Sequence, residues 1–409
     1  MSVDAIIEAR PSHVSFAEES TVSVGAVTGF FFAFRLFFVL LAVRVFQQEA
    51  NVGVAVSLAL NYLLVAAVVL NSFGETKRPW STFWRQPCFR CAAAYLTLSG
   101  LSLVWSVADS KAAAIAFWLA MAADTLVVAW MLRTHDAESV ATSLMSGYVW
   151  GASVIAAIAW ILPAQSDLRL GDEELLGPNQ IGWLCGLAFF FAQYLIQRKT
   201  SGAWKAHAFL LGVTLLRSLS KTTIIAFIVA QFYILLRDAT IPRKTKVMLC
   251  LSALLVCGVF ANLLSNYLDV YTTGNQSESL TGRVGIWAYI FAEALDRPWF
   301  GHGFHSVWKV IPPFYGTFEA RHAHNELLQQ FYAYGAAGVA LLVVTYGSIL
   351  RTVRKLTSTS RIFFGGLLIF IVIRGFADTE VFDLSWPMWL IVLFGALAVQ
   401  SARDKEATV

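Results

Sequence analysis

Long apolar stretches separated by short polar segments run through almost the whole chain. A membrane-crossing helix needs about 20 mainly apolar residues, and most of these stretches reach or approach that length. We therefore predict an all-α polytopic membrane protein with about 12 transmembrane helices. The expected spans are 23–46, 51–72, 91–107, 112–132, 140–163, 179–197, 207–219, 221–236, 247–267, 326–350, 362–376 and 387–401.

The polar loops set the expected orientation. Lys and Arg are concentrated in four loops, at 73–90, 197–207, 237–246 and 351–361. These loops fall on one side when the spans alternate, so the positive-inside rule makes that side cytoplasmic. Both tails, 1–22 and 402–409, are then cytoplasmic. The first lacks the basic segment and cleavage site of a signal peptide, so we expect it to stay on the chain.

Composition agrees with a membrane protein. Of the 409 residues, 57% are hydrophobic and 14% are charged, and the mean hydropathy is +0.64. A soluble domain carries roughly 25% charged residues. The net charge of +4 is small. The concentration of Lys and Arg in short loops suits membrane topology better than nucleic-acid binding.

Two segments depart from regular spans. Residues 207–236 lie between two basic loops, so the chain must cross and return in about 30 residues, where two full spans need about 40. The polar turn 217–223 is expected to line a cavity open to the outer side, because polar groups at membrane depth need protein or water around them. The second segment, 268–325, is a large outer loop. Such loops are usually functional.

We expect one amphipathic helix in this loop, from Gly282 to Leu295. Its predicted apolar face consists of Val284, Ile286, Trp287, Ile290, Phe291 and Leu295. Pro298 ends the helix, and Gly301-His302-Gly303 follows as a turn.

Cationic and histidine side chains gather at the outer ends of the expected spans and in the large outer loop. They are Arg217, Lys221, Arg283, His322, His324 and Arg374. Ionisable groups near a membrane are costly and are functional candidates. Several cations with few acids favour an anionic ligand, and Arg matches phosphate oxygens. Simpler alternatives are that Arg217 and Lys221 reach lipid headgroups, that Arg283 pairs with a nearby acid, and that His324 only begins a helix.

Three further features have structural alternatives. Arg35 lies within the apolar run 29–41, where it either pairs with a buried acid or lines the cavity, unless the span is misplaced. Gly335 and Gly338 are three residues apart and would allow close helix packing. His302 and His305 fit loop positions better than catalytic ones.

Metal and cofactor motifs are not found in the sequence. Cys88 and Cys91 have CxxC spacing without a second pair, whereas a zinc site needs about four ligands. Carboxylate partners for His322 and His324 at ligand spacing are not evident. There is no P-loop, dinucleotide fingerprint or nucleophile elbow. We expect no metal, no cofactor and no disulfide framework.

Several motifs together resemble the O-antigen ligase and Wzy-type polymerase superfamily. His324-Asn325, followed after nine residues by Gly335-x-x-Gly338, is similar to its signature. Thr281-Gly282-Arg283-x3-Trp287 and the run 298–304, Pro-Trp-Phe-Gly-His-Gly-Phe, resemble its loop motif. Ser220-Lys221-Thr222 stands where many members have Ser-Arg, and Asn179 where members often have an Asn that starts a span. The motifs cover roughly residues 175–385.

The resemblance implies a GT-C-like glycosyltransferase of the inner membrane with its site facing the periplasm. The implied donor is an undecaprenyl-diphosphate-linked oligosaccharide. The acceptor is another glycan chain for a polymerase, or lipid A core for a ligase, and neither a nucleotide sugar nor a metal is required. Membrane lipids surround the protein, and chain-length regulators or export proteins are possible partners.

Departures from the family pattern favour one branch. Lys221 replaces the usual Arg, and Arg217 one turn earlier is a candidate substitute. Val-Ala follows Gly338 where ligases commonly have Thr-Thr. The run 301–308 and the Ser-Lys-Thr turn look more like exopolysaccharide polymerases of the succinoglycan type, so we favour a polymerase over a ligase.

The hypothesis assigns catalysis to His324 and Arg283. Arg283, with Lys221 or Arg217, would hold the diphosphate and stabilise its charge. His324 would act as general base or hold phosphate, with His322, Asn325 and Arg374 as further binding residues. The glycines Gly301, Gly303, Gly335 and Gly338 are given structural roles. A lipid-linked-glycan flippase is the main rival, although no inverted repeat is found. A non-catalytic scaffold is a third reading.

Overall fold

Helices make up the regular structure of the described chain, with no strand among its residues. The structure is a computed structural model, and it describes residues 16–47, 50–72, 77–162, 170–171, 176–198, 201–259, 280–306, 322–379 and 384–407. The helices are α1 (Phe16–Arg44), α2 (Ala50–Asn71), α3 (Trp80–Trp84), α4 (Pro87–Ser102), α5 (Lys111–Thr134), α6 (Ala137–Ile161), α7 (Pro178–Gln197), α8 (Trp204–Arg217), α9 (Lys221–Arg237), α10 (Arg243–Val259), α12 (Leu280–Ala294), α14 (Glu326–Lys355), α15 (Ser358–Gly375) and α16 (Met388–Ala407).

Within the described residues, each helix other than α3 and α12 overlaps one of the expected spans. Five helices in this part of the chain are long and apolar enough to cross a membrane, namely α2, α5, α6, α14 and α15. Shorter apolar stretches occur at Val24–Arg35 and Met388–Ser401. The helical content and these spans agree with a polytopic membrane protein. The number twelve, the orientation and the domain limits stay predictions.

The ends of the first and last helices differ from the expected tails. α1 already begins at Phe16, and α16 continues to Ala407. Helical backbone therefore extends past both expected span ends, because a helix does not stop where its apolar run stops. The side chains of Cys88, Cys91 and Cys185 are buried and free.

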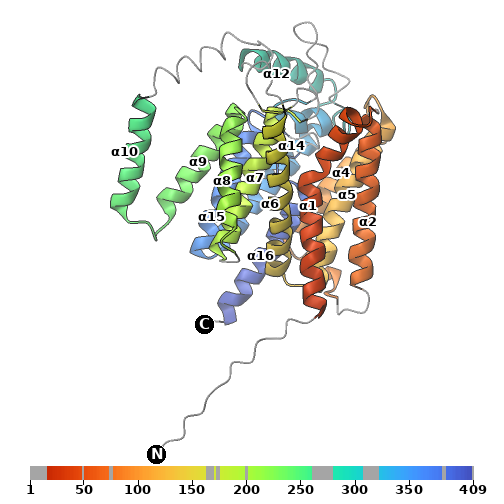
Figure 1. Cartoon of the computed structure of the whole chain (residues 1–409). Coiled ribbons are helices and arrows are strands. Elements are labelled where there is room, and N and C mark those ends of the chain that lie inside the picture. Colours follow the sequence, from red (N-terminus) through yellow and green to blue (C-terminus); the bar gives the residue numbers. More distant parts are fainter. Residues whose placement is uncertain are drawn as a thin grey trace, which may run out of the picture.

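Close packing fixes the centre of the bundle. A Cβ atom at Gly29 on α1 would collide with the backbone of Leu144 on α6, and one at Gly147 on α6 would collide with the backbone of Ala26. Small residues in these positions let the two backbones approach. α12 lies across one end of the bundle, and the last turns of α16 lie at the other (Figure 1). We refer to the first as the α12 end.

The short pair α8 and α9 is present as predicted. The two helices have 14 and 17 residues, and a tight turn at 218–220 connects them with Leu219 at φ 56°. The Ser220 hydroxyl donates to Asn179 Oδ1 over 2.9 Å. The turn is thereby tied to the start of α7.

The predicted loop helix is also present, as α12, but its expected apolar face is partly wrong. Ile286, Ile290 and Ala294 are buried against Tyr332 of α14. Val284, Phe291 and Leu295 are about half exposed, at 53%, 49% and 53%. A helix only 15 residues long can bury one narrow stripe against a single neighbour. Phe291 lies at the edge of this stripe, with its ring 5.9 Å from that of Phe331 on α14.

The expected continuous span 326–350 is broken at Gly335. This glycine adopts φ 63° and ψ −152° inside α14, and the segment before it folds back beside the segment after it. The Tyr346 hydroxyl consequently reaches the Glu326 carboxylate over 2.8 Å. Gly338 has no room for a Cβ, which would lie 2.7 Å from the Gln330 carbonyl oxygen.

The loop 298–303 fills the break in α14. The backbone N–H of Ala336 donates to the Pro298 carbonyl, and those of His302 and Gly303 donate to the carbonyls of Tyr332 and Ala333. These bonds satisfy backbone groups that the break frees. Gly301 and Gly303 adopt φ 63° and 93° within this contact. The break therefore joins the loop motif to the histidine-bearing helix.

Candidate functional site

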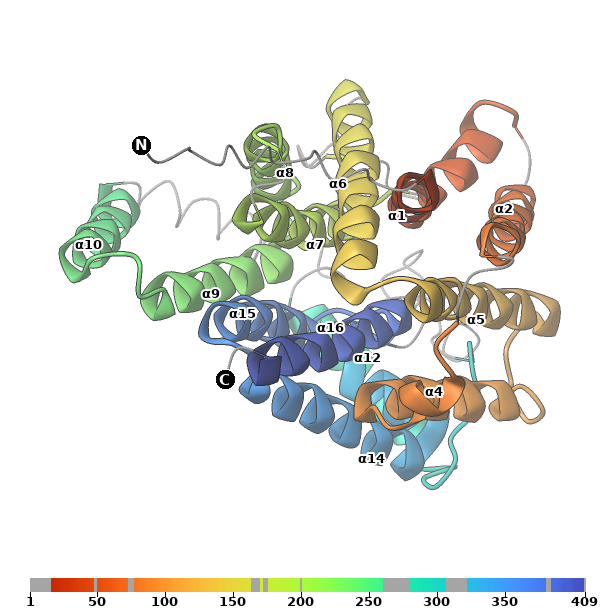
Figure 2. The same ribbon diagram turned by 90° about the horizontal axis from the view of Figure 1, so that it is seen from below.

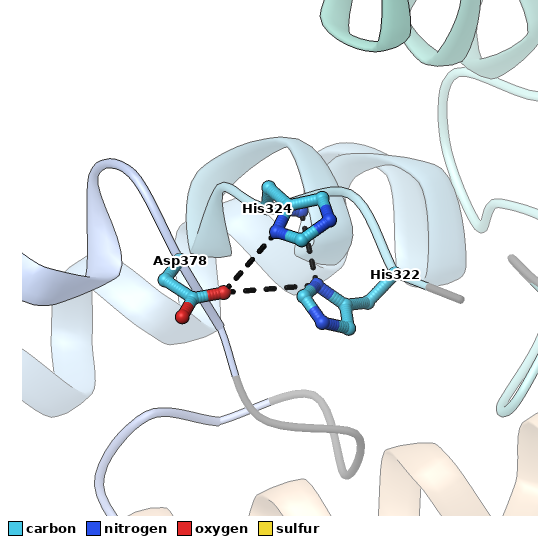
Figure 3. A group of neighbouring side chains, drawn as sticks. All are labelled: His322, His324 and Asp378. Atoms are coloured by element: carbon cyan, nitrogen blue, oxygen red, sulfur yellow. Dashed lines mark hydrogen bonds and ion pairs between the residues drawn. The ribbon is translucent and has the colours of Figure 1, made fainter. Parts of the chain in front are cut away.

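Three segments from distant parts of the chain meet near the α12 end of the bundle. They are residues 322–325 before α14, residues 376–379 after α15, and the first turn of α9. Figure 3 shows His322 and His324 from the first segment directed toward Asp378 of the second. This group, with the cations around it, is the candidate site.

His324 is held in a defined tautomer. Its Nδ1 lies 3.2 Å from Asp378 Oδ1, and because a carboxylate only accepts, Nδ1 carries the proton. In the neutral ring Nε2 is then a proton acceptor. His324 has φ 49°, a backbone conformation that costs a non-glycine residue about 1–3 kcal/mol. The surrounding contacts hold this strained residue in place.

His322 is the neighbour of this pair. Its Nδ1 accepts the backbone N–H of His324 over 3.2 Å, and the two rings lie 4.0 Å apart between centroids. Burial lowers the pKa of His322, and His324, Arg374 and Arg283 lower it further, against the opposing effect of Asp378. His322 is therefore a neutral ring with its proton on Nε2.

Asp378 connects the histidines to Arg374. Its Oδ2 lies 3.3 Å from Arg374 Nη2, four residues earlier, and its Oδ1 accepts the backbone N–H of Thr379. Burial alone would raise the pKa of Asp378, but the Arg374 charge and the hydrogen bond from His324 hold it well below its usual range. The carboxylate is thus ionised beside the two rings.

Two guanidinium groups meet at the start of α9. Arg374, only 2% exposed, donates through Nε to Thr223 Oγ1 at 3.4 Å and lies 4.5 Å from the centroid of the Trp183 ring. Arg283 of α12 donates to Thr222 Oγ1 over 3.3 Å and to the Ala377 carbonyl oxygen. Positive side chains and a helix N-terminus together favour an anion here.

The other expected site residues take different positions. Arg217 is the last residue of α8 and Lys221 the first of α9, so they flank the turn beside Thr222. Asn325 caps α14, because its Oδ1 accepts from the Leu328 N–H and its Nδ2 donates to the Phe376 carbonyl. This capping ties the histidine segment to the segment that carries Asp378.

His302 and His305 lie in the 298–306 loop and pack as ring systems. His302 stacks on Tyr332 at 4.4 Å, and His305 stacks on Phe117 at 4.9 Å. Burial lowers the pKa of both rings. They support the loop against α14 and α5.

The structure supplies the carboxylate that sequence spacing did not reveal. His322, His324 and Asp378 have nitrogen and oxygen atoms within 4.8 Å of one another, a spacing suited to a metal ion. The local charge does not suit a cation, because Arg374 pairs with this carboxylate and both guanidiniums act on His322. His322 Nδ1 also accepts a backbone N–H. Within the described residues, the cluster fits a His–Asp pair beside an anion site better.

Three residues of the site were missed by sequence reasoning. Thr222 and Thr223 contact the two arginines, and Asp378 orients His324. Asp378 had a detectable signal, since an Asp four residues after Arg374 at the end of a span is a typical intrahelical ion-pair spacing. The threonines belong to the polar turn 217–223 that was expected to line a cavity, but neither was named as a site residue, because hydroxyls at a helix start usually act as caps.

Comparison with known proteins agrees with the resemblance. A family model described as O-antigen ligase matches residues 206–343. This stretch includes Lys221, Arg283, His322, His324 and Gly335, and ends before Arg374 and Asp378. None of the curated proteins compared with the chain matches it significantly. The match confirms the resemblance to the O-antigen ligase and Wzy superfamily, whereas the preference for the succinoglycan type stays a prediction.

Proposed function

From this O-antigen ligase match we propose that the chain is an inner-membrane glycosyltransferase that acts on an undecaprenyl-diphosphate-linked glycan. The α12 end faces the periplasm in this proposal, and the glycan is moved onto another glycan chain. The observation that carries it is the His324–Asp378 pair beside two guanidinium groups. A base and an anion site are the two elements that such a transfer needs.

The anion site supports a diphosphate leaving group. Arg283 and Arg374 converge on consecutive residues, Thr222 and Thr223, at the start of α9. Guanidinium groups and helix N–H groups stabilise phosphate charge that develops as the bond to the sugar breaks. Lys221 adds a cation at the same helix start.

The histidine supports activation of the acceptor. The acceptor hydroxyl gives its proton to Nε2 of His324, and its oxygen attacks the anomeric carbon. The bond from that carbon to the diphosphate breaks, and undecaprenyl diphosphate leaves with the electron pair. Asp378 stabilises the imidazolium that forms. A single displacement of this kind inverts the anomeric configuration, and it needs no metal.

A ligase that uses lipid A core is the second candidate, favoured by the description of the matching family. We keep the polymerase first because of the residues after Gly338 and the run 301–308. A flippase would not need an oriented base, so the His324–Asp378 pair favours a glycosyltransferase over a flippase.

One reconstitution distinguishes these functions. Purified protein is given undecaprenyl-diphosphate oligosaccharide in liposomes, with and without lipid A core. A ladder of longer glycans supports the polymerase, and a single addition to lipid A core supports the ligase. Movement across the bilayer without bond formation overturns the proposal.

A further inference from the structure

A second polar centre lies inside the bundle, away from the histidines. Arg35 of α1 forms an ion pair with Asp124 of α5, with Nη1 2.5 Å from Oδ2. Asn61 of α2 donates to the other carboxylate oxygen over 2.7 Å. The sequence left open whether Arg35 pairs with a buried acid or lines a cavity. In the structure it does both.

The cavity has a volume of about 150 Å³, and its walls are mainly apolar with one polar part. Aromatic rings contribute one part of its lining, from Phe32, Tyr148, Trp183 and Trp389. The polar part comes from Arg35, Asp124, Thr125 and Gln180. Figure 2 shows α1, α5, α6 and α16 arranged around the same central region of the bundle.

The charged pair is costly unless it has a role. Replacing a buried ion pair by well-packed apolar side chains is often neutral or stabilising, and ionisable groups within membrane proteins usually mark functional sites. The Asp124 side chain is 6% exposed and the Arg35 side chain 26%. Arg35 therefore presents part of its side chain to the cavity. A carboxylate has about four acceptor positions, more than Arg35 and Asn61 occupy.

Helix packing around the cavity favours an occupant that enters from one end of the bundle. Around the cavity α1 packs on α6, α6 on α16, α16 on α5, α5 on α2 and α2 on α1. A lipid tail entering from the side would have to part these pairs. Gln180 and Met388 lie in the first turns of α7 and α16, so the cavity reaches toward the α12 end, from which a water-soluble group can enter.

A saccharide matches both kinds of wall. Its C–H faces stack on aromatic rings, and its hydroxyls bond to Arg, Asp, Thr and Gln side chains. We propose that the central cavity lined by Arg35, Asp124, Trp183 and Trp389 is a saccharide subsite. The assignment rests on the proposed function, since the donor glycan and its acceptor are the saccharides that this enzyme meets.

Trp183 connects the subsite with the candidate catalytic site. Its ring lies 4.5 Å from the Arg374 guanidinium and stacks on Phe370 at 5.6 Å, while it also lines the cavity. A sugar in the cavity is thus one side chain away from the arginine that pairs with Asp378. This places the subsite next to the proposed reaction.

Binding to the full-length protein in nanodiscs tests the subsite through tryptophan fluorescence. The probes are lipid-linked oligosaccharide extracted from the native cells, the glycan released from it by mild acid, and undecaprenol. The main variant is Arg35→Leu/Asp124→Leu, which removes both charges together. The matched control is Gln193→Leu/Gln231→Leu, which removes a doubly hydrogen-bonded polar pair between α7 and α9 outside the cavity.

We expect the charge-pair variant to fold and to bind released glycan at least about tenfold more weakly, while the control binds like the wild type. If the charge-pair variant does not fold, Ala120→Leu decides, because it fills the cavity from a half-buried position and keeps the ion pair. Unchanged glycan binding in the folded variants overturns the subsite. The saccharide subsite is also overturned if the wild type binds undecaprenol but no glycan, and if Ala120→Leu abolishes that undecaprenol binding.

The probes also separate the source of the sugar. If the cavity variants bind both the lipid-linked oligosaccharide and the released glycan more weakly, the cavity holds donor sugar. If they bind only the released glycan more weakly, the cavity holds acceptor sugar. Wild-type protein that binds glycan through this cavity but transfers none contradicts the proposed function alone. Active protein whose glycan binding ignores both cavity variants contradicts the subsite alone.

Discussion

The carboxylate of Asp378 lies 3.2 Å from Nδ1 of His324, although 54 residues separate them in the chain. The pair depends on the Asn325 cap, which fixes the start of α14 to the Phe376 carbonyl. It also depends on Arg374, which holds Asp378 from the last turn of α15. Removing one partner should therefore change the chemistry of the other.

Asp378→Asn should lower kcat by about 100-fold or more while KM changes little, because general-base catalysis typically contributes 10²–10⁴-fold. An amide does not fix the proton on His324 Nδ1 and cannot balance the imidazolium. Transfer kinetics with lipid-linked oligosaccharide measure this effect. Asp296→Asn, which removes an exposed acid on the adjacent loop, is the control and should leave kcat unchanged. An active Asp378→Asn enzyme would show that the pair is only structural.

Arg283→Lys should raise KM for the lipid-linked donor by about tenfold or more. Lysine keeps the charge but lacks the planar guanidinium fork that binds phosphate oxygens in pairs, and it also loses the Nη1 group that donates to Thr222 and to the Ala377 carbonyl. Arg297→Lys, an exposed change in the same segment, is the matched control. A donor KM equal to that of the wild type would remove Arg283 from the diphosphate site.

Gly335→Ala should destabilise the fold by about 2 kcal/mol or more. Its φ of 63° is strained for alanine, and the new Cβ would lie 2.6 Å from Phe300 N and Pro298 O. Gly347→Ala on the same helix meets nothing within 4 Å and should be neutral or slightly stabilising. Unfolding temperatures of both variants compare the two positions, and equal values would contradict the strained break.

The structure shows why the sequence predicts the helices better than the site. Apolar length finds the five described helices that can cross a membrane, because burial in lipid demands about 20 apolar residues whatever the fold. The sharp break at Gly335 is not evident from hydropathy, since the residues on both sides are equally helical. The small residues Gly335 and Gly338 indicate that something packs closely against α14. They do not indicate whether this is a neighbouring helix or a loop such as 298–303.

The candidate site illustrates the same limit. The sequence predicts His324 and Arg374 from charge at span ends and Arg283 from its place in the large outer loop, and all three lie around the same three segments. Asp378 was not, because its relation to His324 depends on how α14 and α15 pack. The exposed Val284 and Phe291 on α12 likewise show that an apolar stripe indicates a buried face only when a partner of matching width is present.

The pKa of Asp378 predicts a pH-dependent contribution to stability. Its folded-state pKa is depressed below the ordinary value of 3.8, so the ionised carboxylate stabilises the fold above that value, and the contribution is lost as pH falls below it. The difference in unfolding temperature between wild type and Asp378→Asn should shrink from about pH 6 to about pH 3. A difference that stays constant would mean that the carboxylate is not held ionised by Arg374.

Removal of divalent cations should leave transfer activity intact. The positive charge around His322 and Asp378 favours an anion over a metal ion. Activity is measured after dialysis against EDTA and again after addition of Mg²⁺, Mn²⁺ or Zn²⁺. Loss on chelation with recovery on one of these ions would identify His322, His324 and Asp378 as metal ligands.

The most direct measurement is the release of undecaprenyl diphosphate by purified protein supplied with lipid-linked oligosaccharide. We expect one undecaprenyl diphosphate for each new glycosidic bond in the wild type, and neither product from properly folded His324→Ala. Release at the wild-type rate by His324→Ala would contradict the role of His324 as the base, and glycan movement without any release would contradict glycosyl transfer itself.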